Sequence, residues 1–212
     1  MATISGLYVI IDPDACGGRD AREVARLALE GGARVLQWRD KRRDKGEQLA
    51  DARAIRALCR ERSVTFIVND HADVAVAVDA DGVHLGQKDL PIEAVRPIVG
   101  ARVIGVSTNN VDEARAAEAA GADYIAVGSI FATRSKEVTR PASLDRLREV
   151  KAAVRVPVVA IGGIDASNIA SVVDAGADAA AVISAVCGAD DVRAAAAELA
   201  AAFTSPPGPL SN

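Results

Sequence analysis

Residues 119–127 read AAGADYIAV and join the end of an alanine-rich helical pattern to a short apolar run. Two other segments repeat this arrangement, EGGARVLQW at 30–38 and DAGADAAAV at 174–182. Each places Gly-Ala at the junction, where glycine can adopt the left-handed conformation that ends a helix without a Cβ clash. Each segment therefore predicts a helix that is followed at once by a strand.

The same alternation continues along almost the whole chain. Strands are expected at 7–11, 34–38, 64–68, 82–86, 102–106, 123–127, 157–161 and 179–183, and helices at 20–31, 46–62, 71–78, 91–98, 110–120, 143–153, 166–175 and 189–203. Alternating strands and helices favour a parallel sheet with crossover helices, and eight strands close a barrel. An open doubly wound sheet also fits, but no Gly-x-Gly-x-x-Gly motif follows the first strand. We therefore predict an α/β fold, a single-domain (β/α)8 TIM barrel over residues 1–203, followed by a disordered Pro-rich tail at 204–212.

The composition narrows the classes of protein that the chain can be. Half of the residues are hydrophobic and 3% are aromatic, so Ala, Val, Ile and Leu are expected to form the core. The net charge of -4 without a basic stripe argues against a nucleic-acid partner. Cys16, Cys59 and Cys187 are widely spaced and are expected to be reduced in a cytoplasmic protein. No long apolar run or basic leader is present, so neither a membrane span nor secretion is expected. The sequence leaves a homo-oligomer open.

Polar and glycine residues follow most of the predicted strands, where the active site of a barrel lies. They are Gln37, Arg39 and Lys41 after the second strand, Asn69 and Asp70 after the third, Gln87 and Asp89 after the fourth, Ser107 after the fifth, Gly162 and Gly163 after the seventh, and Ser184 after the eighth. Each has an ordinary alternative: the run DKRRDK around Lys41 is typical of a solvated face, and Asp70 or Asp89 can cap a helix. Their convergence on one rim favours a functional site.

Two carboxylates suggest a metal. Asp70 and Asp89 follow neighbouring strands, which lie about 4.8 Å apart in a sheet, so both can reach one cation. Oxygen ligands without a His or Cys cluster favour Mg2+, completed by waters and substrate phosphate. Loops after the seventh and eighth strands of a barrel often bind phosphate through backbone N–H groups. Two phosphate-binding sites are therefore predicted, one with Mg2+, Arg39, Lys41 and Lys136, and one with backbone amides.

Other residues have two interpretations. His84 lies inside a strand and is expected to be a hydrogen-bonded core residue rather than a catalyst. Trp38 and Phe131 can stack on a flat ring or simply pack. Asp12 and Asp14 can face the pocket, although Pro13 between them fits an ordinary turn equally well.

Together these residues resemble the thiamine phosphate synthase (thiamine-phosphate pyrophosphorylase) family. The matching motifs are QWRDK at 37–41, ND at 69–70, DGVHLGQKD at 81–89, GVS at 105–107, FATRSK at 131–136, IGGI at 161–164 and GADAAAVIS at 176–184. The likeness spans residues 4–203. Asn109, where many relatives carry histidine, and Arg134-Ser135 depart from the family pattern.

The resemblance implies a transferase that joins a pyrimidine diphosphate to a thiazole phosphate by dissociative loss of diphosphate. It assigns the pyrimidine diphosphate to Gln37, Trp38, Arg39, Asp40, Lys41, Asn69, Ser107 and Lys136, of which Arg39, Lys41, Ser107 and Lys136 would be catalytic. It assigns Mg2+ to Asp70 and Asp89, and the thiazole phosphate to Thr133, Arg134, Ser135, Gly163, Ile183 and Ser184. The segment 131–142 is expected to be poorly ordered without ligand. The alternatives are a thiazole tautomerase-like isomerase and a non-catalytic barrel that binds a thiamine precursor.

Overall fold

A closed barrel of eight parallel strands forms the centre of the molecule in the computed structural model, which describes residues 2–132 and 143–204. Each strand pairs with the next in the chain, and the last pairs with the first. The strands are β1 (Gly6–Ile11), β2 (Val35–Trp38), β3 (Thr65–Asn69), β4 (Gly82–Leu85), β5 (Val103–Thr108), β6 (Tyr124–Gly128), β7 (Val158–Ile161) and β8 (Ala179–Val182). The predicted (β/α)8 barrel is confirmed.

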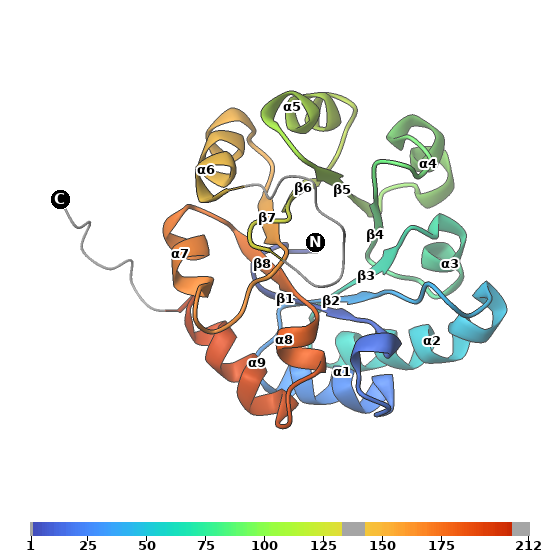
Figure 1. Cartoon of the computed structure of the whole chain (residues 1–212). Helices are drawn as coiled ribbons and strands as arrows, with labels where there is room; N and C mark the ends of the chain where they lie inside the picture. The colour runs from blue at the N-terminus through green and yellow to red at the C-terminus, as the bar shows by residue number, and fades with distance from the viewer. Residues whose placement is uncertain (1, 133–142, 205–212) are drawn as a thin grey trace.

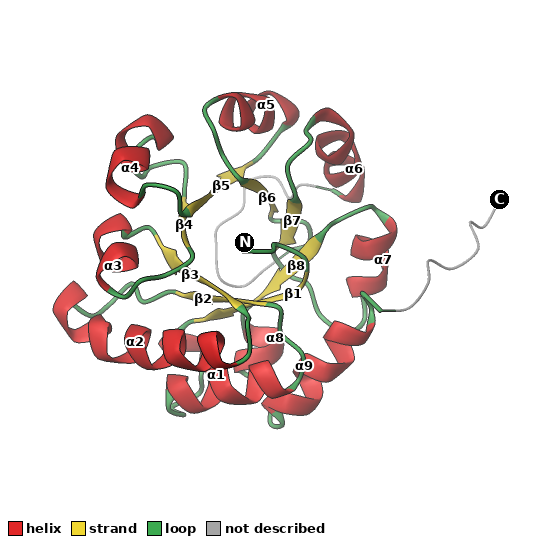
Figure 2. Cartoon of the chain, turned by 180° about the vertical axis from the view of Figure 1, so that it is seen from behind, coloured by secondary structure: helices red, strands yellow, loops and turns green. Residues whose placement is uncertain are grey.

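Helices surround the barrel on its outside (Figures 1 and 2). They are η1 (Pro13–Ala15), α1 (Ala21–Glu30), α2 (Lys45–Glu61), α3 (Ala72–Ala77), α4 (Ile92–Val99), α5 (Val111–Ala119), α6 (Leu144–Ala153), α7 (Ile169–Asp174), α8 (Ser184–Cys187) and α9 (Val192–Ala201). The predicted strands differ from the observed ones by no more than two residues at either end. The short helix α8 was not predicted. None of the described helices combines the length and apolar composition that a membrane span requires.

Side chains alternate between two apolar clusters. Residues such as Tyr8 and Ile10 point into the barrel, whereas Leu7, Val9 and Ile11 pack outward against the helices. The tail predicted for residues 204–212 lies outside the described residues, except for Thr204, which hydrogen-bonds to the end of α9.

A glycine in β5 admits a large side chain into the barrel. A Cβ atom on Gly105 would lie 1.9 Å from the Tyr124 ring. Tyr124 is fully buried, so any other residue at position 105 would displace its ring. Gly105 therefore belongs to the construction of the barrel interior.

Three aspartates stabilise the N-terminal end of the barrel in the same way. Each stands just before an even-numbered strand, accepts a hydrogen bond from the backbone of the preceding strand and contacts a basic side chain. Asp81 accepts from Phe66 N at 2.8 Å and contacts Arg56 at 3.0 Å, Asp123 accepts from Ile104 N at 2.8 Å and contacts Arg96 at 2.8 Å, and Asp178 accepts from Val158 N at 2.7 Å and contacts Lys151 at 2.6 Å. The repeated Gly-Ala-Asp of the sequence supplies two of the three.

Candidate active site

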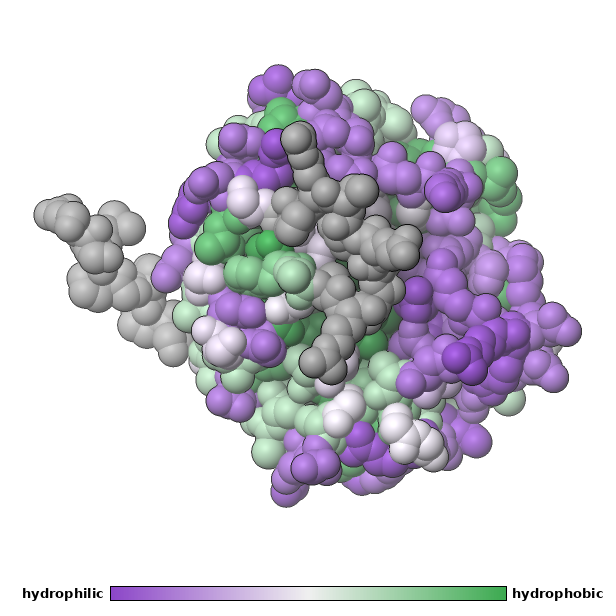
Figure 3. All heavy atoms as spheres, in the orientation of Figure 1, coloured by the Kyte–Doolittle hydropathy of each residue, from purple (hydrophilic) through white to green (hydrophobic). Residues whose placement is uncertain are grey.

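A cavity of about 460 Å³ opens among the C-terminal ends of the strands. It is lined by Tyr8, Ile10, Asp12, Asp14, Ala15, Gln37, Arg39, Asn69, His84, Ser107, Tyr124, Ala126, Val159, Ile161, Ala181, Ile183 and Ser184. Hydrophilic residues gather over α2 and α3 on the right of this face, and hydrophobic residues gather beside α7 on the left (Figure 3). The lining residues themselves form a polar wall from β2 to β5 and a mostly apolar wall from β6 to β8.

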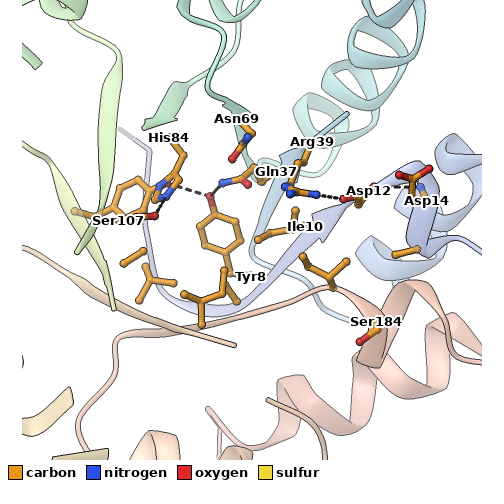
Figure 4. A pocket seen from close by; sticks show the side chains of 17 residues that line it. Tyr8, Ile10, Asp12, Asp14, Gln37, Arg39, Asn69, His84, Ser107 and Ser184 are labelled. Carbon is orange, nitrogen blue, oxygen red and sulfur yellow. Dashed lines mark hydrogen bonds and ion pairs between the residues drawn. The ribbon is translucent and has the colours of Figure 1, made fainter. Parts of the chain in front are cut away.

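Arg39 is fixed at the cavity by an ion pair. Its guanidinium group contacts the carboxylate of Asp12, which comes from the neighbouring strand end (Figure 4). Asp12 is 6% exposed and also accepts a hydrogen bond from Asp14 N, at 3.1 Å. A guanidinium group has five N–H donors, so this pairing orients Arg39 and leaves donors that can reach an anion in the cavity.

Asp70 and Asp89 lie within hydrogen-bonding reach of each other, and Lys41 Nζ lies 2.9 Å from Asp70 Oδ2. Asp70 has a φ of 62°, a left-handed conformation in which aspartate is one of the better-tolerated residues. Burial raises the pKa of Asp70, but the hydrogen bonds from Lys41 and Asp89 outweigh it, so that pKa lies below its ordinary value. The pair that the sequence predicted is therefore assembled.

The second carboxyl group of the pair behaves in the opposite way. Burial and the nearby carboxylate of Asp70 raise the pKa of Asp89 above its ordinary value, against the opposing backbone N–H of Gly86 at 2.6 Å. Two carboxylates in contact favour a shared proton, since both cannot easily carry charge. A divalent cation between them would replace that proton.

The polar wall continues with Gln37, Asn69 and Ser107, which all line the cavity as predicted. His84 is hydrogen-bonded through both ring nitrogens, as expected of a core histidine, yet it also lines the cavity. Gln87 lies beside this wall and donates to Ser107 O.

The apolar wall leads to the start of α8. Ile183 and Ser184 line the cavity there, as predicted. Gly163, in the turn after β7, has a φ of 66°, and a Cβ atom at this position would lie 2.7 Å from Ala132 O and 2.8 Å from Phe131 Cβ. Phe131 thus packs against the turn after β7, which favours the packing interpretation of its ring.

Four described residues that were predicted to contact substrate are not among those that line the cavity: Trp38, Asp40, Lys41 and Gly163. Trp38 follows the inward-facing Gln37, so its ring points outward, is 1% exposed and donates to Gln48 Oε1 at 3.3 Å. The carboxylate of Asp40 accepts from Arg42 N and from both the backbone and the side chain of Arg43. The outer core and the turn after β2 thus use the side chains of Trp38 and Asp40, and their contact with substrate stays a prediction.

Four predicted residues, Thr133, Arg134, Ser135 and Lys136, lie outside the described residues, as does most of the segment 131–142. Conversely, the sequence did not single out Tyr8 or Tyr124, and it left Asp12 undecided. All three line the cavity. The glycine at position 105 was the available signal for Tyr124, since a strand glycine often marks close approach of a neighbouring group.

The fold and the cavity define a class, the TIM-barrel enzymes, whose active sites lie at the C-terminal ends of the strands. The family model described as thiamine monophosphate synthase matches residues 7–186. The chain belongs to this family. It is 51% identical over 195 residues to the thiamine-phosphate synthase of Moorella thermoacetica, covering 91% of this chain and 93% of that protein. It is 48% identical over 196 residues to that of Chloroflexus aurantiacus, covering 92% and 91%.

A solved structure agrees with this assignment. The thiamine phosphate pyrophosphorylase from Pyrococcus furiosus has a TM-score of 0.88 and 43% identity, covering 94% of this chain and 95% of that one. The agreement extends over nearly the full length of both chains.

Proposed function

We propose that the chain is a thiamine phosphate synthase. It transfers the pyrimidinylmethyl group of 4-amino-2-methyl-5-(diphosphooxymethyl)pyrimidine to a thiazole phosphate, giving thiamine phosphate and diphosphate. With the carboxythiazole phosphate as acceptor, CO2 is also released. The observation that carries the proposal is that Arg39 lines the cavity while Lys41, Asp70 and Asp89 come together beyond the ends of β2, β3 and β4.

These residues suit a diphosphate that binds with a divalent cation. Arg39 pairs with Asp12, and Lys41 pairs with Asp70, which contacts Asp89. A diphosphate alone would compete with these carboxylates for both basic side chains. A cation held by Asp70 and Asp89 would offset the charge of the carboxylates and of the diphosphate.

The residues present fit Mg2+. In residues 2–132 and 143–204 no group of three or more His, Cys, Asp or Glu is arranged to hold a metal. Mg2+ needs fewer protein ligands, because it is commonly held by one or two carboxylates and completed by waters and substrate phosphate. Asp70 and Asp89 would hold the ion, which would neutralise charge on the departing diphosphate.

The apolar wall suits the thiazole ring. Ala126, Val159 and Ala181 leave room beside it, and Ser184 and the turn at Gly163 offer polar groups for its phosphate. The acceptor nitrogen would then approach from the side opposite Arg39 and Lys41.

The chemistry requires that the bond between the methylene carbon and the diphosphate oxygen breaks, with its electron pair leaving on the diphosphate. The thiazole nitrogen then supplies the electron pair for the new bond. Arg39 and Lys41 stabilise negative charge as it builds on the diphosphate, in a partly closed site where Coulomb interactions are stronger than in water. We also propose a cytoplasmic location, which the buried thiols of the three cysteines support.

Product analysis tests the proposal. The purified chain, both substrates and Mg2+ should give thiamine phosphate, diphosphate and CO2 in equal amounts when the carboxythiazole is used. Isomerisation of the thiazole without diphosphate release would identify a tautomerase instead. Binding of a precursor without turnover would identify a non-catalytic barrel.

The metal site has its own test. Replacing Asp89 by asparagine should lower activity by at least ~100-fold, because an ion that neutralises transition-state charge contributes several kcal/mol. Calorimetry should show that Mg2+ no longer strengthens diphosphate binding to the variant, and circular dichroism should show an intact fold. The matched control is Asp73→Asn, an exposed aspartate that contacts Lys45 and should behave as wild type. Full activity of Asp89→Asn in the presence of a chelator would contradict the site.

A further inference from the structure

Five polar side chains form one continuous hydrogen-bonded chain across the floor of the cavity. Gln37 Nε2 donates to Tyr8 Oη at 2.7 Å, and Tyr8 Oη lies 3.0 Å from Tyr124 Oη. Tyr124 Oη lies 2.9 Å from His84 Nδ1, and His84 Nε2 lies 2.8 Å from Ser107 Oγ. All five residues line the cavity, and the labelled members point toward one another in Figure 4.

Gln37, the first member, fixes the order of donors and acceptors along the whole hydrogen-bonded chain. An amide nitrogen only donates, so Tyr8 accepts from Gln37 and can give its own proton to Tyr124. Tyr124 then gives its proton to His84 Nδ1. A ring nitrogen that accepts is unprotonated, so the proton of a neutral His84 lies on Nε2 and is donated to Ser107 Oγ. Ser107 accepts within the chain and keeps its own proton for a donor bond into the cavity.

The two other states of His84 leave a buried hydroxyl group unsatisfied. A proton lies on Nδ1 in both the other neutral tautomer and the imidazolium. Tyr124 Oη would then accept from His84, and its own proton could be satisfied only by donation to Tyr8. Tyr8 would then accept twice, and its own proton would meet no acceptor among the described residues. Tyr8 is 1% exposed, and leaving a buried donor unpaired costs free energy. Burial also raises the pKa of Tyr8 and of Tyr124, which keeps both hydroxyl groups protonated.

We propose that Tyr124 and His84 are positioning residues that hold Ser107 as an obligate hydrogen-bond donor to a ring nitrogen of the pyrimidine substrate. The substrate part of this inference rests on the proposed function. A serine hydroxyl group can normally either donate to a ligand or accept from it. Because Ser107 Oγ already accepts from His84, it is left to act as a donor toward the substrate. The site would then favour an aminopyrimidine, whose ring nitrogens accept, over a pyrimidinone that carries N–H at the same place.

Nuclear magnetic resonance tests the direction of the chain without any turnover. The protein has two histidines, His71 and His84, so the ring nitrogens of a 15N-histidine-labelled sample can be assigned with a His71→Gln variant. Wild-type His84 is expected to carry its proton on Nε2 with Nδ1 unprotonated. A proton on Nδ1 at neutral pH would overturn the proposal.

Two matched variants each remove one buried hydroxyl group. Tyr124→Phe takes away the donor to Nδ1, so His84 should show a mixture of tautomers. Tyr8→Phe leaves that donor in place, so His84 should keep its Nε2 proton. Identical His84 spectra for the two variants would overturn the role of Tyr124, and the Tyr8 variant still tests the order of the chain if Tyr124→Phe does not fold.

Kinetics separates positioning from a structural role. Tyr124→Phe should raise KM for the pyrimidine diphosphate by about tenfold, the upper range of one neutral hydrogen bond, with little change in kcat or in KM for the thiazole phosphate. In a Ser107→Ala background the same substitution should cost almost nothing more, because the group that it positions is gone. An equal penalty in both backgrounds would overturn the proposal. A wild-type protein without synthase activity would remove the assigned substrate, whereas the spectra would still decide the direction of the chain.

Discussion

The two ends of the barrel both carry clusters of aspartates, but the bonds that these aspartates make differ. At the N-terminal end, Asp81, Asp123 and Asp178 each accept from a strand backbone and contact one basic side chain. At the C-terminal end, Asp70 and Asp89 contact each other, Asp70 pairs with Lys41, and Asp89 accepts from Gly86 N within its own loop. Aspartates of the first kind join neighbouring strands, whereas those of the second kind are left in a carboxyl–carboxyl contact, for which we propose a divalent cation.

The difference follows from the free energy of a buried carboxylate. A carboxylate that accepts from backbone N–H groups and a cation keeps its charge at little cost. A carboxylate that faces another carboxylate is held in an unfavourable state by the surrounding fold, and such strain is typical of functional sites. The contrast predicts that substitutions at one end change stability and substitutions at the other change activity.

The largest expected effect is on activity at the C-terminal end. Lys41→Met removes one of the two described basic side chains that we propose contact the diphosphate, so kcat/KM for the pyrimidine substrate should fall by ~100-fold or more. The free energy of unfolding should change by less than about 1 kcal/mol, because the Lys41 side chain is 53% exposed. Lys45→Met is the matched control, since both lysine side chains are 53% exposed. Equal losses of activity in the two variants would show that Lys41 is only a surface charge.

The next effect is on stability at the N-terminal end. Asp178→Ala leaves Val158 N–H and Lys151 without this partner, which should lower the free energy of unfolding by about 1–3 kcal/mol. The corresponding fall in Tm is about 2–4 °C for each kcal/mol in a domain of this size. The measurement is thermal denaturation together with kcat/KM, which should stay within about twofold of wild type. Asp174→Ala, at the exposed end of α7, is the control.

A loss of activity without a loss of stability in Asp178→Ala would break the comparison between the two ends. It would show that a change at the N-terminal end of β7 alters the active-site cavity. A fall in Tm that Asp174→Ala reproduces would instead assign the effect to the α7 connection in general.

The sequence predicted the barrel because its strands are short apolar runs and its helices end at glycines, both local signals. It also predicted the assembly of Asp70 with Asp89, since residues after neighbouring strands must meet. It could not separate Gln37 from Trp38, because strands buried on both faces show no polar alternation. Helix α8 was missed because four residues carry too little periodicity.

The cavity floor was the hardest part to predict. Tyr8, His84 and Tyr124 come from three different strands, and only the register of the closed barrel brings their polar atoms together. Inside a strand each of them looks like an ordinary core residue. The sequence therefore located the strand ends that form the rim, but not the polar groups of the barrel interior.

Asp40 separates the effect of location from the effect of bonding. It lies at the C-terminal, active-site end of the barrel, but its carboxylate accepts from backbone and basic side-chain groups, like the aspartates at the N-terminal end. Its carboxylate is 4% exposed and accepts from Arg42 N at 2.9 Å, Arg43 N at 3.1 Å and Arg43 Nε at 2.5 Å. Burial raises the pKa of Asp40, but these backbone and side-chain donors outweigh it and hold that pKa below its ordinary value. If bonding rather than location decides the role, Asp40→Asn should change stability and leave the kinetics intact.

The expected loss on Asp40→Asn is about 1 kcal/mol at neutral pH, the smallest of the series, with KM for the pyrimidine substrate unchanged. A carboxyl group whose pKa is lower in the folded state stabilises the fold at pH values above its unfolded pKa, and this contribution disappears as the pH falls through the folded pKa. The difference in unfolding free energy between wild type and variant should therefore be constant above about pH 5 and shrink below about pH 4. Urea denaturation across that range measures it, with the exposed Asp145→Asn as a control that should show no such trend. A raised KM with unchanged stability would mean that Asp40 binds substrate after all, and that location at the rim outweighs the saturation of its bonds.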